Sequence, residues 1–207
     1  MMVLSTAWEN CFNDLGGSKP PSCIFEELQA RYSEPHRAYH TLQHLQECFA
    51  WFNETRSLMR APGNVAFALF YHDAIYDTHA SNNEARSAAL ARTILEEYVR
   101  CDNDFDAIET LILATRHDVV AQPGDAQLLV DIDLSILGAP PFRFDEYERQ
   151  VRREYDWVSE DIFRSARTRI LGEFVKRPAL YNTTFFRERL ETQARANLAR
   201  SVQALTI

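Results

Sequence analysis

Long apolar runs are missing from this 207-residue sequence, and glycine is scarce, with only six residues. No stretch has the roughly 20 consecutive apolar residues that a membrane-spanning helix needs. The N-terminal residues lack the positive charge and sustained apolar core of a secretory signal. We therefore expect a cytoplasmic protein that has no membrane partner.

The four cysteines are few and widely spaced along the chain. No two of them form the CxxC pattern that is typical of zinc sites and thioredoxin-like redox sites. The sequence therefore predicts reduced thiols that pack as small buried side chains.

Positive charge is also in short supply, because the formal net charge is −8. Affinity for a nucleic-acid polymer comes largely from basic side chains that neutralise phosphates, so this balance argues against such a partner. The basic residues are almost all arginine, which can bind a phosphate group through two parallel hydrogen bonds. A small phosphorylated ligand stays compatible with the composition.

Strand signals are few, whereas helical spacing of apolar residues recurs along most of the chain. The exception is LLVDIDLSILG at residues 128–138, where apolar and polar residues alternate as in a strand although the flanking segments are helical. Ser81 and Glu84 form a capping-box pattern at the start of one helix. The sequence predicts helices at residues 3–15, 22–32, 38–52, 65–76, 81–100, 105–117, 144–157, 159–176 and 184–204.

The segment VAFALFYHDAIY, residues 65–76, is apolar on all sides and yet contains His72 and Asp73. A helix without a polar face is expected to be buried, so this segment is predicted to be the central helix. A buried imidazole or carboxylate needs hydrogen bonds, a counter-charge or a metal ion. The pair is therefore the first candidate for chemistry.

His40 and His44 are four residues apart, a spacing that places two side chains on one face of a helix. With His72, Asp73 and a carboxylate from 131–133, they form a mixed nitrogen and oxygen ligand set for a divalent metal. The alternative for the histidines is core packing with satisfied hydrogen bonds. The alternative for Asp131 and Asp133 is a role as turn or capping residues, and only one of them needs to be a ligand.

The order YHxxxH, then HD, then an aspartate in DIDLSILG resembles the HD superfamily of metal-dependent phosphohydrolases. The runs RYSEPHRAYHTLQH, FYHDAIYD, SNNEARSA and DIDLSILGAP are similar to a bacterial family of predicted HD-domain phosphohydrolases. They extend over residues 31–141. The resemblance implies an all-α HD-domain helical bundle, a single domain over 1–207 whose C-terminal helices, 142–207, pack on the metal-site region.

The same resemblance implies the roles of individual residues. His40 would be the catalytic proton donor, and Asp73 would bind metal. As a mechanistic hypothesis, Asp73 or the late aspartate could also orient the attacking water molecule. The late aspartate would lie on a helix, with Asp133 preferred over Asp131. The metal would be Mn, Mg, Co, Fe, Ni or Zn. The implied metal ligands are His44, His72, Asp73 and Asp133.

Four further residues lie near these motifs and are candidates for binding the substrate, a small phosphorylated metabolite such as a nucleotide. Arg37 and Arg116 could stabilise phosphate charge, or each could form a structural ion pair. His117 could reach the pocket or cap its helix. Glu84 is either a pocket residue or the capping-box partner of Ser81.

One position departs from the related phosphodiesterases: Tyr76 stands where they have another histidine, which puts a second metal in doubt. The expected function is hydrolysis of a phosphate ester. An HD-type di-iron oxygenase, for which His117 and Asp77 would be the extra ligands, and a non-catalytic nucleotide-binding module are the alternatives. A homodimer is the default expectation for assembly.

Overall fold

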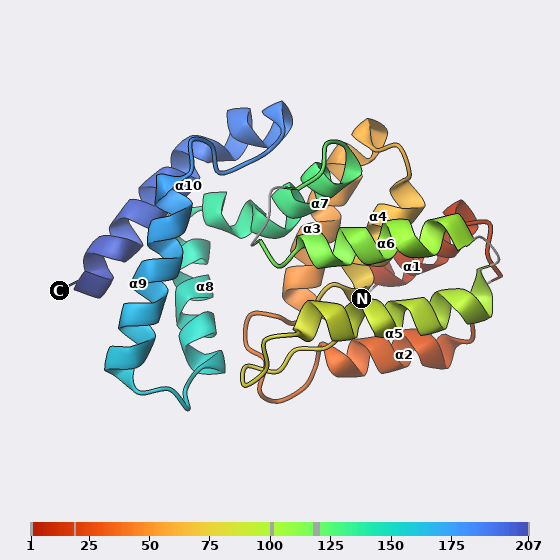
Figure 1. Ribbon diagram of the computed structural model, residues 1–207, viewed down its shortest axis with the longest axis horizontal. Helices are drawn as coiled ribbons and strands as arrows, with labels where there is room; N and C mark the ends of the chain where they lie inside the picture. Colours follow the sequence, from red (N-terminus) through yellow and green to blue (C-terminus); the bar gives the residue numbers. More distant parts are fainter. Residues whose placement is uncertain (1, 19, 100–101, 118–120, 207) are drawn as a thin grey trace. The chain divides into compact units, whose positions relative to one another are not determined.

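The computed structural model describes residues 2–18, 20–99, 102–117 and 121–206, and all regular elements in this part of the chain are helices (Figure 1). The predicted all-α class is confirmed. The chain divides into two compact units, residues 1–132 and 133–207. The single HD domain stays a prediction. Among the described helices, none combines the length and apolarity that crossing a membrane requires.

The first unit is built around α4, which packs against four other helices, α1, α3, α5 and α6 (Figure 1). Every residue of α4 from Gly63 to Tyr71 is buried, as its apolar sequence predicts. The aromatic side chains Phe67 and Phe70 form a cluster with Trp8 of α1. The elements of this unit are α1 (Met2–Asp14), α2 (Ser22–Arg31), α3 (Leu42–Thr55), the 3₁₀ helix η1 (Arg56–Leu58), α4 (Pro62–Tyr71), α5 (Asn83–Tyr98), α6 (Asp102–Ala114) and α7 (Asp125–Asp133).

The central helix is shorter than predicted, because α4 ends at Tyr71 and His72 is its C-cap. Beyond this point tertiary hydrogen bonds take the place of helical ones. The carbonyl oxygens of Asp73 and Ala74 accept hydrogen bonds from Arg37, and the Ile75 N–H donates to Ser87. His72 and Asp73 therefore lie in a turn at the end of the helix, not in its middle.

The helix predicted at residues 38–52 begins only at Leu42, so His40 precedes it. Thr41 is the N-cap, and its hydroxyl oxygen accepts a hydrogen bond from the Gln43 N–H. Threonine at this position satisfies one of the unpaired amides at a helix start, which explains the late beginning. The prediction that His40 and His44 share a helical face is therefore wrong, although both still reach the same site.

Helix α5 begins at Asn83 with Asn82 as its N-cap, and no side chain caps it through a hydrogen bond. The capping box predicted for Ser81 and Glu84 is therefore wrong. Instead, Asn83 bonds to the preceding loop, because its amide oxygen accepts from the Asp77 N–H and its amide nitrogen donates to the Asp77 carbonyl.

The cysteine prediction holds only in part. Cys11 and Cys48 are free and buried, as expected, whereas Cys23 is free and exposed near the start of α2. Cys101 lies outside the described residues.

The second unit is built on the 3₁₀ helix η2, Leu134–Gly138, which packs against α8 and α10. The Tyr181 hydroxyl donates to the Leu134 carbonyl, and the Asn197 amide donates to the Leu137 carbonyl. A Cβ on Gly138 would lie 2.6 Å from Leu190 Cβ, so this close approach requires glycine. The other elements are α8 (Pro141–Glu154), α9 (Glu160–Lys176) and α10 (Thr184–Thr206), and α9 packs on α10. The ambiguous stretch 128–138 is thus helical.

Candidate metal centre

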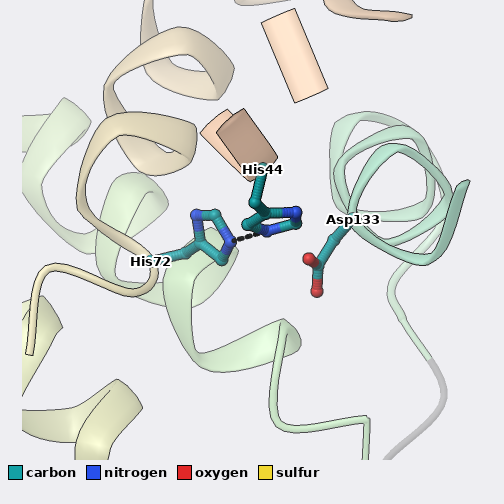
Figure 2. A group of neighbouring side chains, drawn as sticks. All are labelled: His44, His72 and Asp133. Atoms are coloured by element: carbon teal, nitrogen blue, oxygen red, sulfur yellow. Dashed lines mark hydrogen bonds between the residues drawn. The ribbon is translucent and has the colours of Figure 1, made fainter. Parts of the chain in front are cut away.

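Three of the predicted metal ligands come together in space, with ligand atoms of His44, His72 and Asp133 all within 4.8 Å of one another. His44 lies in the first turn of α3, His72 caps α4, and Asp133 is the last residue of α7, whose other residues belong to the first unit. Figure 2 shows the two imidazoles turned toward each other and the Asp133 carboxylate facing them.

The spacing of these atoms fits ligands of one ion. His44 Nε2 lies 3.2 Å from His72 Nε2. Two ligands bound about 2.1 Å from one ion lie about 3.0 Å apart in octahedral geometry and about 3.4 Å apart in tetrahedral geometry. The two nitrogens therefore fit adjacent positions around a divalent metal.

The tautomer of His72 supports the same reading. Its Nδ1 lies 2.8 Å from the Leu69 carbonyl oxygen, which can only accept, so Nδ1 carries a proton and donates it. In a neutral imidazole Nε2 then presents a lone pair. Hydrogen bonding of the second ring nitrogen to a carbonyl is the usual support of a metal-binding histidine.

Asp73 lies beside both imidazoles. Its Oδ2 is 3.0 Å from His72 Nε2 and 3.6 Å from His44 Nε2. A carboxylate oxygen and a nitrogen lone pair repel at this distance unless a proton or a metal cation lies between them. The site therefore requires a cation, either a second proton on His72 or a bound metal.

The charge balance at Asp73 agrees with this requirement. Burial by itself raises the pKa of the Asp73 carboxyl, but attraction to the neighbouring imidazoles of His72, His40 and His44 in their protonated form, and the hydrogen bond that a protonated His72 donates, outweigh burial. The pKa of Asp73 is thereby held well below its ordinary value. Asp73 is an anion at neutral pH and offers a negatively charged oxygen ligand.

Helix α7 carries both rival aspartates, and it is fixed to the start of α4. The Asp125 carboxylate at its beginning accepts hydrogen bonds from the Arg60 and Ala61 N–H groups at 2.9 and 2.8 Å. At its other end Asp133 joins the two histidines, whereas Asp131 is fully buried and is not part of that group. Two residues along a helix differ by about 200° in direction, so the two aspartates leave α7 on different sides.

This geometry predicts that the two aspartates respond differently to the same substitution. Asp133→Asn is expected to weaken metal binding by about 10- to 100-fold, because a neutral amide replaces an anionic ligand. Asp131→Asn is expected to keep metal affinity near that of the wild type while it lowers thermal stability, because it alters a buried polar group. Titration with Mn²⁺ by isothermal calorimetry measures the metal affinity of each variant, and thermal unfolding measures the stability of Asp131→Asn. Equal losses of affinity would contradict the assignment of Asp133.

His40 lies at the edge of this centre, half-buried in the loop that precedes α3. Its ring centroid is 6.0 Å from that of His44 and 4.1 Å from that of Tyr76, on which it stacks. The predicted proton donor is therefore next to a predicted metal ligand.

Arg37 is buried, with no exposed side-chain surface. Its guanidinium donates to Glu34 and to the carbonyl oxygens of His40, Asp73 and Ala74, at 2.7 to 3.2 Å. Of the two alternatives for Arg37, substrate contact or structural ion pair, this geometry favours the structural one.

The positions of the other predicted substrate-binding residues do not decide between their alternative roles. Glu84 is half-buried in the first turn of α5, and Arg116 is exposed just after α6. His117 has a backbone φ of 56°, in the left-handed region common where helices terminate, which agrees with its capping alternative. Asp77, a proposed di-iron ligand, accepts a hydrogen bond from the His79 N–H in the loop before α5. Substrate contact by these residues stays a prediction.

Several residues that support the site were not predicted from the sequence. The Ser87 hydroxyl accepts from the Ile75 N–H, so α5 holds the turn that follows Asp73. Cys48 Sγ lies 3.7 Å from both ring nitrogens of His44. The Leu69 carbonyl sets the tautomer of His72. The i, i+4 spacing of His44 and Cys48 is a sequence signal for one of these contacts, whereas backbone contacts leave no such signal.

Comparisons with protein-family models, curated proteins and solved structures give no match to this chain. The function is therefore inferred from the chemistry of the site.

Proposed function

We propose that this chain is a metal-dependent phosphohydrolase of the HD type that cleaves a phosphate ester of a nucleotide or another small phosphorylated metabolite. The observation that carries the proposal is the pair of imidazole nitrogens, 3.2 Å apart, with the Asp73 carboxylate 3.0 Å from one of them. Three converging ligands with a fixed His72 tautomer are what a catalytic divalent-metal site needs.

The position of Asp133 gives independent support. A carboxylate in the last turn of a helix lies at the negative end of the helix dipole, which is unfavourable without a compensating cation. A metal at this point would supply that cation. The site residues would be His44, His72, Asp73 and Asp133.

A bound divalent metal would supply Lewis-acid chemistry, by polarising a phosphate oxygen and lowering the pKa of a water molecule. The protein side chains would orient the water molecule and supply the proton. Asp73 would orient the attacking water through its carboxylate. His40, at the edge of the site, would donate a proton to the ester oxygen as the phosphorus–oxygen bond breaks.

A substrate screen with matched variants tests the proposal. Phosphomonoesters, phosphodiesters, and nucleoside di- and triphosphates are offered to the metal-free protein with Mn²⁺, Co²⁺ or Mg²⁺ added. Phosphate or alcohol release is expected from at least one class, and Asp73→Ala is expected to lower the rate by at least about 100-fold. Asp77→Ala is the control, because the Asp77 carboxylate accepts from the His79 N–H and lies 4.0 Å from the Arg86 guanidinium of α5.

Two results would contradict the hydrolase: no substrate cleaved by the wild type, or equal cleavage by Asp73→Ala. Metal analysis and a nucleotide-binding measurement separate the remaining alternatives. Two redox-active iron ions per chain would favour the oxygenase, and nucleotide binding without turnover would favour a binding module.

A further inference from the structure

Tyr76 and His40 come from different loops, yet their rings stack with centroids 4.1 Å apart and planes inclined by 27°. Tyr76 lies in the loop that follows Asp73, and His40 lies in the loop that precedes α3. Stacking at this distance limits how far an imidazole can tilt or swing away. The tyrosine ring is therefore a surface against which His40 is held.

The backbone around Tyr76 is itself fixed. On one side the Ile75 N–H donates to Ser87 at 3.0 Å, and on the other the Asp77 N–H donates to Asn83 at 3.2 Å. His36 Nε2 donates to the Tyr76 carbonyl at 2.8 Å. Tyr76 therefore lies in a loop that is hydrogen-bonded both to α5 and to the loop that contains His36 and His40.

Arg37 joins the two loops directly. One guanidinium nitrogen donates to the His40 carbonyl at 3.1 Å and to the Asp73 carbonyl at 2.7 Å. The guanidinium carbon lies 5.4 Å from the centre of the Tyr76 ring and 5.2 Å from that of Tyr32, within the range of cation–π contacts. The buried cation therefore fixes the backbone of His40 and braces the ring on which His40 stacks.

We propose that Tyr76 is a positioning residue for His40, which it holds in the orientation that protonates the leaving group. The inference rests on the proposed phosphohydrolase function. In that reaction a water oxygen forms a bond to phosphorus and the ester phosphorus–oxygen bond breaks. The ester oxygen keeps the electron pair and takes the proton from His40. The proton released by the water replenishes His40, so the products are an alcohol and inorganic phosphate.

Leaving-group dependence distinguishes this role from a structural one. A p-nitrophenolate leaves without help, whereas a phenolate, whose conjugate acid has a pKa of about 10 like that of tyrosine, gains from protonation. Loss of His40 orientation should therefore slow phenyl phosphate hydrolysis more than p-nitrophenyl phosphate hydrolysis. A general loss of structure would slow both equally.

The experiment measures kcat for both esters in the metal-loaded wild type, Tyr76→Leu, Tyr76→Phe and the control Tyr98→Leu, which alters another half-buried tyrosine at the end of α5. Tyr76→Leu is expected to lower the phenyl phosphate rate by about 10- to 100-fold more than the p-nitrophenyl phosphate rate. Tyr76→Phe keeps the ring and is expected to keep the wild-type ratio, as is Tyr98→Leu.

A readout without catalysis accompanies the kinetics. In NMR spectra of histidine-labelled protein, the His40 ring protons are expected to show an upfield ring-current shift from Tyr76 that is lost in Tyr76→Leu and remains in Tyr76→Phe. The Tyr39 ring, 4.9 Å from that of His40, is present in every variant. Parallel losses on both esters with loss of bound metal, or an unchanged His40 resonance in Tyr76→Leu, would overturn the positioning role. A wild type that cleaves neither ester and no other substrate of the screen, while the ring-current shift is present, contradicts the hydrolase and not the stacking.

Discussion

His72→Ala is expected to abolish metal binding, so that metal content falls from about one ion per chain to close to none. The substitution removes the nitrogen that lies 3.2 Å from His44 Nε2 and 3.0 Å from Asp73 Oδ2. Without it the site keeps one nitrogen ligand, His44 Nε2, beside the carboxylates of Asp73 and Asp133. Elemental analysis after dialysis against Mn²⁺ measures the effect directly.

Thermal stability provides a second measurement of the same prediction. A ligand that binds only the folded chain stabilises it by an amount that grows with concentration, about 2.7 kcal/mol at 100 times Kd. Mn²⁺ is expected to raise the melting temperature of the wild type and to leave that of His72→Ala unchanged. His79→Ala, at an exposed histidine of the following loop, is the control and should respond as the wild type does. Unchanged metal content in His72→Ala would show that the His-Asp pair is structural.

Phe70→Ala is expected to be the most destabilising of the substitutions considered, with a loss of about 3–5 kcal/mol in the free energy of unfolding. The Phe70 side chain is fully buried, and its ring centroid lies 4.4 Å from that of Phe49 and 5.1 Å from that of Trp8. Its carbonyl also accepts a hydrogen bond from the Tyr32 hydroxyl. Truncation would leave a cavity that these large rings cannot easily fill.

Urea denaturation followed by circular dichroism measures this loss. Leu58→Ala, at a side chain that is 53% exposed, is the control in the same unit and is expected to change the free energy of unfolding by less than about 0.5 kcal/mol. A small effect of Phe70→Ala would mean that α4 does not organise the core of the first unit.

Burial of the central helix follows from composition alone. Residues 65–71 have no polar side chain on any face before His72, and a segment of this kind is stable only when other elements cover it. The choice of candidate ligands also follows from residue type, because imidazole nitrogens and carboxylate oxygens are the groups that bind divalent metals. The structure confirms the all-α class and brings His44, His72 and Asp133 together.

The end of α4 depended on contacts that no local pattern contains, whereas the start of α3 depended on a local cap. Apolar spacing continues past Tyr71, but α4 ends there because Arg37 and Ser87, distant in sequence, bind the next backbone groups. His40 has helical spacing to His44, but a threonine cap starts α3 after it. Side-chain-to-backbone bonds override periodicity in both places, from distant segments at the end of α4 and from the neighbouring Thr41 at the start of α3.

The sequence by itself therefore determined a helical protein with a buried central helix and a set of nitrogen and oxygen side chains that are candidate metal ligands, because burial and ligand chemistry depend on residue type and spacing. Only the tertiary structure decided that Asp133, and not Asp131, joins the two histidines. It also decided that Arg37 is buried between two loops and that Tyr76 stacks on His40. These outcomes depend on the packing of segments far apart in the chain, and the direction of a side chain within such packing is not encoded in local spacing.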